Sequence, residues 1–503
     1  MFNVDIFANV VLGFSVALTP TNLLFCFLGS VVGTLVGVLP GLGPVGAVAF
    51  LLSLTFKMAP ATAVIMLAGI YYGAMYGGST TSILVNIPGE TASVVTCLDG
   101  YRMARQGRAG AALGIAAFGS FIAGTFGVIG LMFLAPMLGR AALRFGPAEY
   151  FALTLTGLTL VAYLTQGSMI KALIMTVLGL LAGSVGMDPI SGEERFTYGS
   201  LTLRDGLGLV PVAMGLFGVA EVLENLAAIG TQSIYETSIK GLLPNRKDWQ
   251  ASGWPIARGS VIGFLLGVLP GPGPVIASFV SYAMEKRLSR HPEKFGTGAI
   301  EGVAGPEAAN NSATAGSFIP LLSLGIPTSA IMALFMGALM IHGIQPGPLF
   351  INKYPELFWG FIASMYIGNA MLLILNLPLI GIWVRVLKTP YAILFPMILL
   401  FCLIGVYTLN SNTTEIIIML IFGIGGFLFR RLGFEGAPFI LAMVLGPMME
   451  TSLRQSLLIS RGSFAIFYTR PICATLLGVA AVFLLWPVFW SRHKTIPRSS
   501  TPP

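Results

Sequence analysis

The sequence predicts an all-α polytopic membrane protein with about ten to twelve transmembrane segments, including broken or re-entrant helices, arranged as two inverted structural repeats. Three observations support this prediction. Of the 503 residues, 55% are hydrophobic and only 10% are charged, against about 25% charged in an ordinary soluble domain. Many uncharged runs of about 18 or more residues are long enough to span a bilayer. Finally, the motif at residues 33–45 is repeated at residues 263–275.

The repeated motif interrupts an apolar run in each half of the chain. Both copies share the core Gly-Val-Leu-Pro-Gly-X-Gly-Pro-Val, with Pro40 and Pro270 in register (270 − 40 = 230). Proline removes a backbone donor, and glycine tolerates dihedral angles that other residues resist. Because lipid cannot satisfy a free backbone group, each break must face protein or a polar cavity. A single break is often a mere kink, but paired broken helices are typical of a transporter's binding site.

The first repeat half is predicted at residues 1–234. Residues 2–18 predict a short helix, either spanning or interfacial, and residues 21–56 predict a broken unit. Its arms are short for a full span, which suits a re-entrant hairpin or one interrupted crossing. The hydroxyl-rich motif at 76–90 follows inside an apolar run, and the basic stretch at 99–108 predicts a cytoplasmic loop. Further spans are predicted near 110–138, 149–165, 168–187 and 206–229.

A basic stretch at 235–258 predicts a cytoplasmic linker, after which residues 259–490 form the second repeat half. Its broken unit at 259–285 is followed by a basic loop, whereas only Lys57 follows the first broken unit. Equivalent points are therefore expected on opposite sides of the membrane, which favours inverted repeats. The motif at 305–328 is the second hydroxyl- and amide-rich segment. Further spans are predicted near 329–343, 355–382, 390–408, 414–429, 437–449 and 463–490, before a disordered tail at 491–503.

Charge, cysteine usage and missing motifs argue against several other classes of protein. The net charge of +8 resides in short loops, so the positive-inside rule explains it and no nucleic-acid partner is expected. The four cysteines and three histidines show no metal-binding spacing, and we expect neither a metal site nor a cofactor beyond a coupling ion. No His-Glu-X-X-His motif and no nucleotide-binding loop occurs, which argues against a metalloprotease and a primary pump.

The polar residues of the broken and hydroxyl-rich segments predict chemistry suited to an anion. A half-helix that restarts after Pro44 or Pro274 exposes free N–H groups, and its N-terminus carries about half a positive charge. Hydroxyls and amides add donors, and freed carbonyl oxygens suit Na⁺. The residues expected to contact substrate are Pro40, Gly41, Gly43, Pro44, Ser79, Thr80, Thr81, Asn86, Pro270, Gly271, Gly273, Pro274, Asn310, Asn311, Ser312 and Thr314. Those expected to couple an ion are Gly41, Gly271, Glu307 and Asn310.

Structural roles stay open for several of these residues and for other charged ones. Ser and Thr in helices often donate to a carbonyl of the preceding turn. Glu450 and Arg454 are four residues apart, which fits a structural ion pair. Glu307 is a candidate to carry a coupling proton. Loop or interface positions are expected for Glu90, Asp99 and Glu301.

These motifs together resemble the large membrane subunit of the tripartite tricarboxylate transporters, the TctA family, along essentially the whole chain. The residues that carry the resemblance are the doubled 33–45 and 263–275 motif, residues 76–79 and 86–89, residues 307–311, and residues 445–447 with Glu450 and Arg454. One departure is Thr328, which follows Ile326-Pro327 where the family more often has Pro-Gly. The resemblance implies a bacterial inner-membrane protein. Its implied partners are a small four-helix membrane subunit, a periplasmic solute-binding protein and a carboxylate substrate.

The resemblance also implies uptake driven by an ion gradient, with Na⁺ and H⁺ both open. A secondary carrier, with an elevator-type motion as one possibility, is therefore the leading hypothesis. A passive organic-anion channel and an intramembrane enzyme are the alternatives, the enzyme being disfavoured because no catalytic signature is evident. Saturable uptake that requires a gradient and a binding protein would separate a carrier from a channel.

Overall fold

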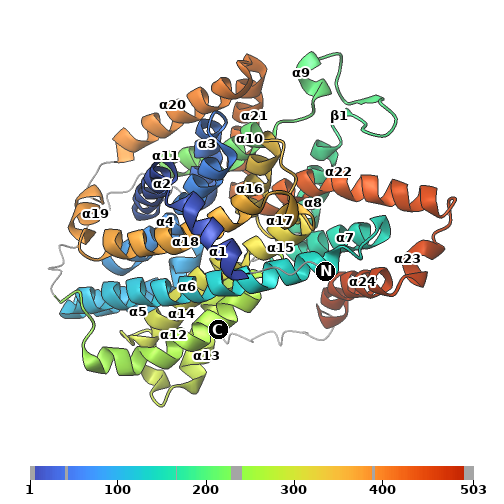
Figure 1. The fold of residues 1–503 in the computed structure, drawn as a ribbon. Coiled ribbons are helices and arrows are strands. Elements are labelled where there is room, and N and C mark those ends of the chain that lie inside the picture. Colours follow the sequence, from blue (N-terminus) through green and yellow to red (C-terminus); the bar gives the residue numbers. More distant parts are fainter. Residues whose placement is uncertain (1–5, 40–42, 166, 228–240, 388–390, 492–503) are drawn as a thin grey trace, which may run out of the picture.

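The computed structural model describes residues 6–39, 43–165, 167–227, 241–387 and 391–491. Figure 1 shows a bundle of helices with one short two-stranded hairpin. In its described part, seven helical segments are long and apolar enough to cross a membrane, and six more are apolar but shorter. The predicted all-α polytopic class is thereby confirmed. Outside the described residues lie 492–503 of the tail expected at 491–503, part of the linker, and Pro40 and Gly41. Ser491, the first residue of the expected tail, is the last residue of a helix.

The elements of the first half follow the predicted spans closely. Up to the first basic stretch they are α1 (Ile6–Ala17), α2 (Pro20–Val38), α3 (Pro44–Thr55), α4 (Pro60–Val85), η1 (Thr91–Ser93), α5 (Val94–Met103) and η2 (Ala104–Arg108). They continue with α6 (Ala109–Ala142), α7 (Pro147–Leu164), α8 (Met169–Gly183), β1 (Gly186–Met187), β2 (Glu194–Arg195), α9 (Leu201–Arg204), α10 (Leu209–Ala213), η3 (Met214–Val219) and α11 (Ala220–Ala227).

The second half begins with a second broken pair of helices. Its elements are α12 (Arg246–Gly267), α13 (Gly273–Leu288), η4 (Pro292–Lys294), α14 (Glu301–Gly316), α15 (Phe318–Leu324), α16 (Ala330–Ile341) and α17 (Phe350–Lys353). They end with α18 (Pro355–Asn376), α19 (Ile380–Val386), α20 (Tyr391–Asn410), α21 (Thr413–Arg431), α22 (Gly436–Ile459), α23 (Ala465–Thr469) and α24 (Pro471–Ser491).

Two basic stretches expected outside helices are helical. Residues 99–108 belong to α5 and η2, with Gly107 at φ 79° as the one residue of η2 that leaves helical geometry. Residues 246–258 of the expected linker form the start of α12. Asn245 caps this helix by accepting from the amide of Asp248 (3.0 Å), whose carboxylate accepts from the Asn245 amide (3.1 Å). Such a capping box explains why a polar sequence starts a helix here.

Each broken unit packs its backbone directly against the helix that carries the polar motif of the same half. A Cβ at Gly33 of α2 would lie 2.7 Å from Cα of Ile70 on α4, and one at Gly263 of α12 would lie 2.7 Å from Cα of Ala309 on α14. The same close approach recurs one turn to either side, at Gly29 and Gly37 against Met66 and Ala74, and at Gly259 and Gly267 against Gly305 and Ala313. Small residues at such spacing let membrane helices pack closely.

The loops that end the polar helices have matching backbone conformations. Asn86 (φ 60°, ψ 30°) ends α4, and Gly325 (φ 73°, ψ 25°) ends α15, both in the left-handed region. Four residues later, Glu90 (φ −148°, ψ 164°) and Ser329 (φ −149°, ψ 169°) begin the next helix. Both pairs are separated by 239 residues (325 − 86 and 329 − 90). Thr328, which replaces Gly89 in the second loop, does not alter this geometry.

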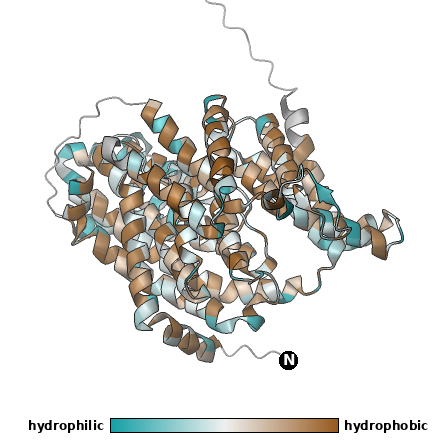
Figure 2. Cartoon of the chain, turned by 90° about the horizontal axis from the view of Figure 1, so that it is seen from above, coloured by the Kyte–Doolittle hydropathy of each residue, from teal (hydrophilic) through white to brown (hydrophobic). Residues whose placement is uncertain are grey.

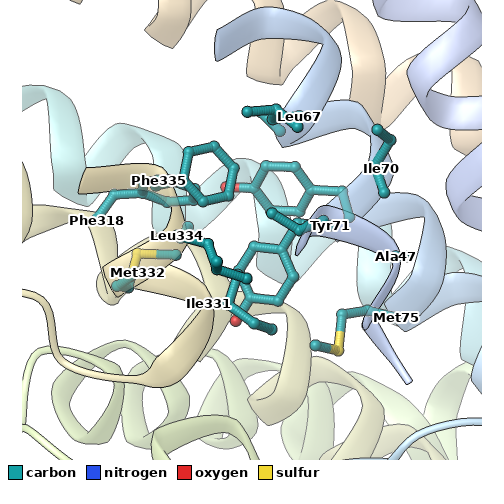
Figure 3. Close-up of a cluster of buried hydrophobic side chains, with 14 of the residues drawn as sticks. Ala47, Leu67, Ile70, Tyr71, Met75, Phe318, Ile331, Met332, Leu334 and Phe335 are labelled. Atoms are coloured by element: carbon teal, nitrogen blue, oxygen red, sulfur yellow. The ribbon is translucent and has the colours of Figure 1, made fainter. Parts of the chain in front are cut away.

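The interior and the outer surface differ in the way expected of a membrane protein. Figure 3 shows a buried cluster in which Tyr71 of α4 lies among Phe318, Ile331 and Phe335 of α15 and α16. The ring centroids of Phe318 and Phe335 are 4.9 Å apart in an edge-to-face arrangement. Figure 2 shows hydrophobic residues along the outward faces of many helices. An apolar outer surface of this kind suits contact with lipid tails.

Candidate functional site

A buried carboxylate links the polar helices of the two halves. Glu307 of α14 is 1% exposed. Its Oε2 accepts a hydrogen bond from the hydroxyl of Ser79 on α4 (2.5 Å), and its Oε1 accepts one from the hydroxyl of Thr96 on α5. Ser79 and Glu307 are two of the residues singled out from the sequence. The fold therefore brings one site residue from each half into direct contact.

A second carboxylate lies beside the first. Glu90, 5% exposed, accepts a hydrogen bond at Oε1 from Nδ2 of Asn310 (3.1 Å) and at Oε2 from the amide of Ala92 (2.5 Å). Asn310 lies three residues after Glu307 and therefore on the same face of α14. Its Oδ1 has no hydrogen-bond partner among the described residues. Glu90 was expected at a loop or interface, but the loop folds inward and buries it.

The neighbouring amide extends the polar cluster to α6. Nδ2 of Asn311 donates to the hydroxyl of Ser120 (2.7 Å) and to the carbonyl oxygen of Glu307 (3.1 Å). Its Oδ1 likewise lacks a partner within the described part of the chain. Two adjacent buried amides therefore each present an unused acceptor, and such groups are costly in a low-dielectric interior.

A small cavity opens beside this cluster, between α4, α6 and α18. Its lining consists of Tyr76, Ser79, Thr80, Leu113, Ala116, Ala117, Ser120 and Asn376. Ser79 and Ser120 connect it to the cluster through their bonds to Glu307 and Asn311. Its volume of about 10 Å³ is close to the minimum that holds one water molecule. The cavity is therefore too small for an organic molecule.

The broken helices lie away from the cavity and engage other partners. The Gly43 amide, at the start of α3, donates to Oε1 of Glu221 (3.2 Å). In the second half the Gly271 amide donates to the carbonyl of Thr328 (2.8 Å), and the Gly273 amide donates to that of Gly271 (2.8 Å). Figure 1 places α3 and α13 on opposite sides of the polar helices. In this conformation the amides of Gly43, Gly271 and Gly273 are therefore taken by groups of the protein itself.

Most of the remaining site candidates hydrogen-bond to backbone. The Thr81 hydroxyl donates to the carbonyl of Val38 (2.7 Å), at the end of the first broken arm. Ser312 donates to the carbonyl of Ser260 (2.7 Å) and Thr314 to that of Asn310 (2.9 Å). Pro44 and Pro274 occupy the first turns of α3 and α13, while Pro270 precedes the second break and Asn86 ends α4.

Glu450 and Arg454 belong to a wider ion network outside this cluster. Arg195, from the β hairpin, donates to both carboxylate oxygens of Glu450 (2.9 and 2.8 Å) and to Asp188 (2.6 Å). Arg454 donates to the same Asp188 oxygen (2.7 Å). Every charge is paired within the network, so it fixes the loop after α8 onto α22. This agrees with the structural alternative considered for the Glu450–Arg454 pair.

Sequence reasoning missed several residues of the cluster and cavity: Glu90, Thr96, Ser120, Tyr76 and Asn376. Ser120 is a single hydroxyl in an apolar run, and Asn376 is a single amide near a helix end, so neither forms a local pattern. Glu90 gave one usable signal, since a carboxylate directly after a helix break can cap the next helix. Its side chain does cap η1.

These features define a multi-pass membrane protein of the transporter class, with a buried polar cluster where its two halves meet. Residues 23–441 match the family model described as the tripartite tricarboxylate transporter TctA family. The chain belongs to this family.

Two relatives from Agrobacterium vitis are similar in sequence. One, described as an uncharacterized 52.8 kDa protein in the TAR-I ttuC' 3' region, is 53% identical over 495 residues, covering 98% of this chain and 99% of the relative. The other, an uncharacterized protein in the TAR-II ttuC' 3' region, is 55% identical over 237 residues, covering 46% of this chain and 98% of the relative. No solved structure matches the chain.

Proposed function

We propose that this chain is the large membrane subunit of a binding-protein-dependent secondary transporter, located in a bacterial inner membrane. It imports a di- or tricarboxylate or a related organic acid, driven by a Na⁺ or H⁺ gradient. Family membership supports the transport of tricarboxylates and the tripartite assembly. The expected partners are a small four-helix membrane subunit and a periplasmic solute-binding protein. No enzymatic activity is proposed.

The observation that carries the proposal is the polar cavity beside the contact between Ser79 and Glu307. Uncharged polar groups line it from three helices: the hydroxyls of Thr80 and Ser120, which can donate, and the side-chain amide of Asn376. Uncharged donors can replace the hydration shell of a carboxylate without holding it too tightly to leave. Substrate enters when the helices around the cavity move apart, because the closed volume is too small.

Two inverted repeats form part of the same proposal. The glycine contacts of the two broken units recur at an offset of 230 residues, and the loops after the polar helices recur at 239. A repeated framework around one central site is the arrangement used for alternating access. In this proposal the packed units reorganise at their two breaks, and Gly271 turns its backbone groups toward the substrate when they do.

The test is uptake into proteoliposomes that contain this chain and its small partner subunit. A panel of labelled carboxylates is offered with and without the binding protein, under separate Na⁺ and H⁺ gradients. We expect saturable accumulation that requires both the gradient and the binding protein. Flux that equilibrates without either would instead identify a channel and overturn the proposal.

An isosteric variant tests the cavity itself. Thr80→Val removes a hydroxyl that lines the cavity, and a hydrogen bond to a charged group contributes about 1.5–3 kcal/mol. We therefore expect the KM for uptake to rise by about 10- to 100-fold. The control is Thr156→Val on α7, whose hydroxyl donates to the carbonyl of Ala152 (2.7 Å) away from the cavity. Equal KM values in the two variants would place the substrate elsewhere.

A further inference from the structure

Two buried carboxyl groups stand side by side without a basic partner. Glu90 is 5% exposed and Glu307 is 1% exposed, and Asn310, three residues after Glu307 on the same face of α14, donates to Oε1 of Glu90 (3.1 Å). No Lys, Arg or His among the described residues forms an ion pair with either. Of the six other buried carboxylates in the described part of the chain, four pair with arginine: Glu285 with Arg258, Asp248 with Arg108, Glu149 with Arg470, and Asp188 with Arg195 and Arg454. Asp99 and Glu415 have no arginine partner there, but each stands apart from a second unpaired carboxylate, whereas Glu90 and Glu307 share the contact through Asn310.

This difference has an energetic consequence. Removing an ionised carboxylate from water costs several kcal/mol even after relaxation, and two neighbouring carboxylates cannot both ionise without a compensating charge. Hydrogen bonds from Ser79, Thr96 and Asn310 stabilise the two groups but bring no positive charge. Neutrality therefore requires a cation or a proton at this position.

The unused oxygen of Asn310 is an independent sign of a ligand. Asn310 is 1% exposed, and its Nδ2 donates to Glu90. The Oδ1 of the same amide group therefore lies close to the Glu90 carboxylate. That oxygen has no partner within the described part of the chain. A buried acceptor next to two carboxylates is suited to a hard cation, which prefers oxygen ligands.

Other titratable groups around the pair do not supply the missing charge. Tyr71 and Tyr76 of α4 and Cys97 of α5 are close enough to interact with the two carboxylates, and all three side chains are ordinarily neutral at pH 7. On α13, Glu285 faces α14, but both of its oxygens accept from Arg258 of α12.

We propose that Glu90, Glu307 and Asn310 form the site of the coupling cation, Na⁺ or H⁺, a proposal that rests on the proposed function. Glu90 comes from the first half and the other two residues come from the second. Bound Na⁺ is held by the carboxylates, Oδ1 of Asn310 and the hydroxyls of Ser79 and Thr96; a bound proton is shared between the carboxyl groups. Because Ser79 also lines the cavity, the cation site lies next to the proposed substrate site.

The experiment measures the thermal unfolding of the purified full chain, without substrate, in sodium or choline chloride over a range of pH. If Na⁺ is the cation, Tm rises saturably with Na⁺ and not with choline. If the cation is H⁺, Tm rises as pH falls, irrespective of Na⁺. Glu90→Gln and Glu307→Gln mimic the protonated carboxyl, so each is expected to be more stable than the wild type in choline at high pH. If the cation is Na⁺, each variant should also weaken the apparent affinity for Na⁺ by about tenfold or more. If the cation is H⁺, the rise of Tm with falling pH should be smaller in each variant than in the wild type.

Glu285→Gln is the matched control, because it neutralises an equally buried carboxylate that already has an arginine partner. It is expected to lose stability while keeping the wild-type cation response. A wild type that responds to neither cation, or Gln variants at positions 90 and 307 that respond like the wild type, would overturn the cation site.

Uptake measurements separate this proposal from the proposed function. If the wild type accumulates carboxylate under a gradient while the Gln variants keep the cation response, the cation site is wrong and the transport function stands. If the cation response is lost in both Gln variants but no carboxylate is accumulated by the wild type, the site stands and the proposed function is wrong.

Discussion

The close packing of α12 on α14 predicts a large effect from the smallest possible substitution. In Gly263→Ala, the new Cβ would lie 2.7 Å from Cα and 2.8 Å from the carbonyl carbon of Ala309. Ordinary contact begins at 3.4 Å, so the helices must separate by about 1 Å, since a packed interior leaves no other room. Backbone rather than a flexible side chain must give way. We expect the free energy of unfolding to fall by about 3 kcal/mol, the upper end for overpacking.

A control on the same helix isolates this contact. A Cβ at Gly253 of α12 would meet nothing within 4 Å, so Gly253→Ala is expected to stabilise the protein by up to about 1 kcal/mol through helix propensity. Gly33→Ala in α2 should reproduce the loss, because its Cβ would meet Ile70 at the same 2.7 and 2.8 Å. The assay is thermal unfolding of the purified variants under identical detergent conditions. If Gly263→Ala were as stable as Gly253→Ala, the glycine contacts would not hold the broken units in place.

Three further predictions follow from other parts of the structure. Asp99→Ala removes the acceptor of three backbone amides, and each amide costs about 1–3 kcal/mol when it is unsatisfied. Hydrogen exchange in the loop before α14 should therefore accelerate, and it should accelerate less in Asp99→Asn. Unchanged exchange in Asp99→Ala would contradict this role of the carboxylate. The hydrogen bond from Arg454 is the main cause that holds the pKa of Asp188 below its usual range. This carboxylate therefore stabilises the fold above about pH 4 and ceases to do so as pH falls further. Asp188→Asn should lower Tm at neutral pH, and the difference from the wild type should shrink in acid; a constant difference would refute the pairing. Ala117→Leu fills the cavity and should abolish uptake, whereas Ala141→Leu, on the exposed face of α6, should not.

The sequence predicted the apolar spans and the positions of the broken helices because both depend on local composition. Proline and glycine mark a break wherever they fall inside an apolar run. The basic stretches were assigned less well, because charge indicates an aqueous position but not its backbone conformation. Arg102 and Arg105 in the first stretch and Arg246 and Lys247 in the second are exposed, and yet all four lie in helical segments.

The site was predicted in part for the same reason. Ser79, Glu307 and Asn310 are polar residues in apolar surroundings, which is a local signal. Glu90 follows a helix break and looks like a loop residue, but Gly89 packs against Gly37 and carries it into the core. Such a contact joins segments that are far apart in the chain, and no local pattern predicts it.

The polar cluster also depends on where the two halves differ. Asn310 and Asn311 stand 239 residues after Tyr71 and Tyr72 (310 − 71), at the offset that superposes the loop conformations of the two halves. Both tyrosines are buried, and Tyr72 has no hydrogen-bond partner for its hydroxyl among the described residues. The repeated framework therefore carries amides in one half and aromatic rings in the other.

The same asymmetry applies to the contact between the halves. At the offset of 239 residues, Ser79 corresponds to Phe318 (318 − 79) and Glu307 to Ala68 (307 − 68). Where one polar helix presents a hydroxyl to a carboxylate, the equivalent positions present an aromatic ring and a methyl group. Figure 3 shows this aromatic side, with Phe318 packed beside Tyr71. Duplicated glycines and prolines build the framework, whereas the unduplicated residues build the site, so we expect one cation per chain and not two.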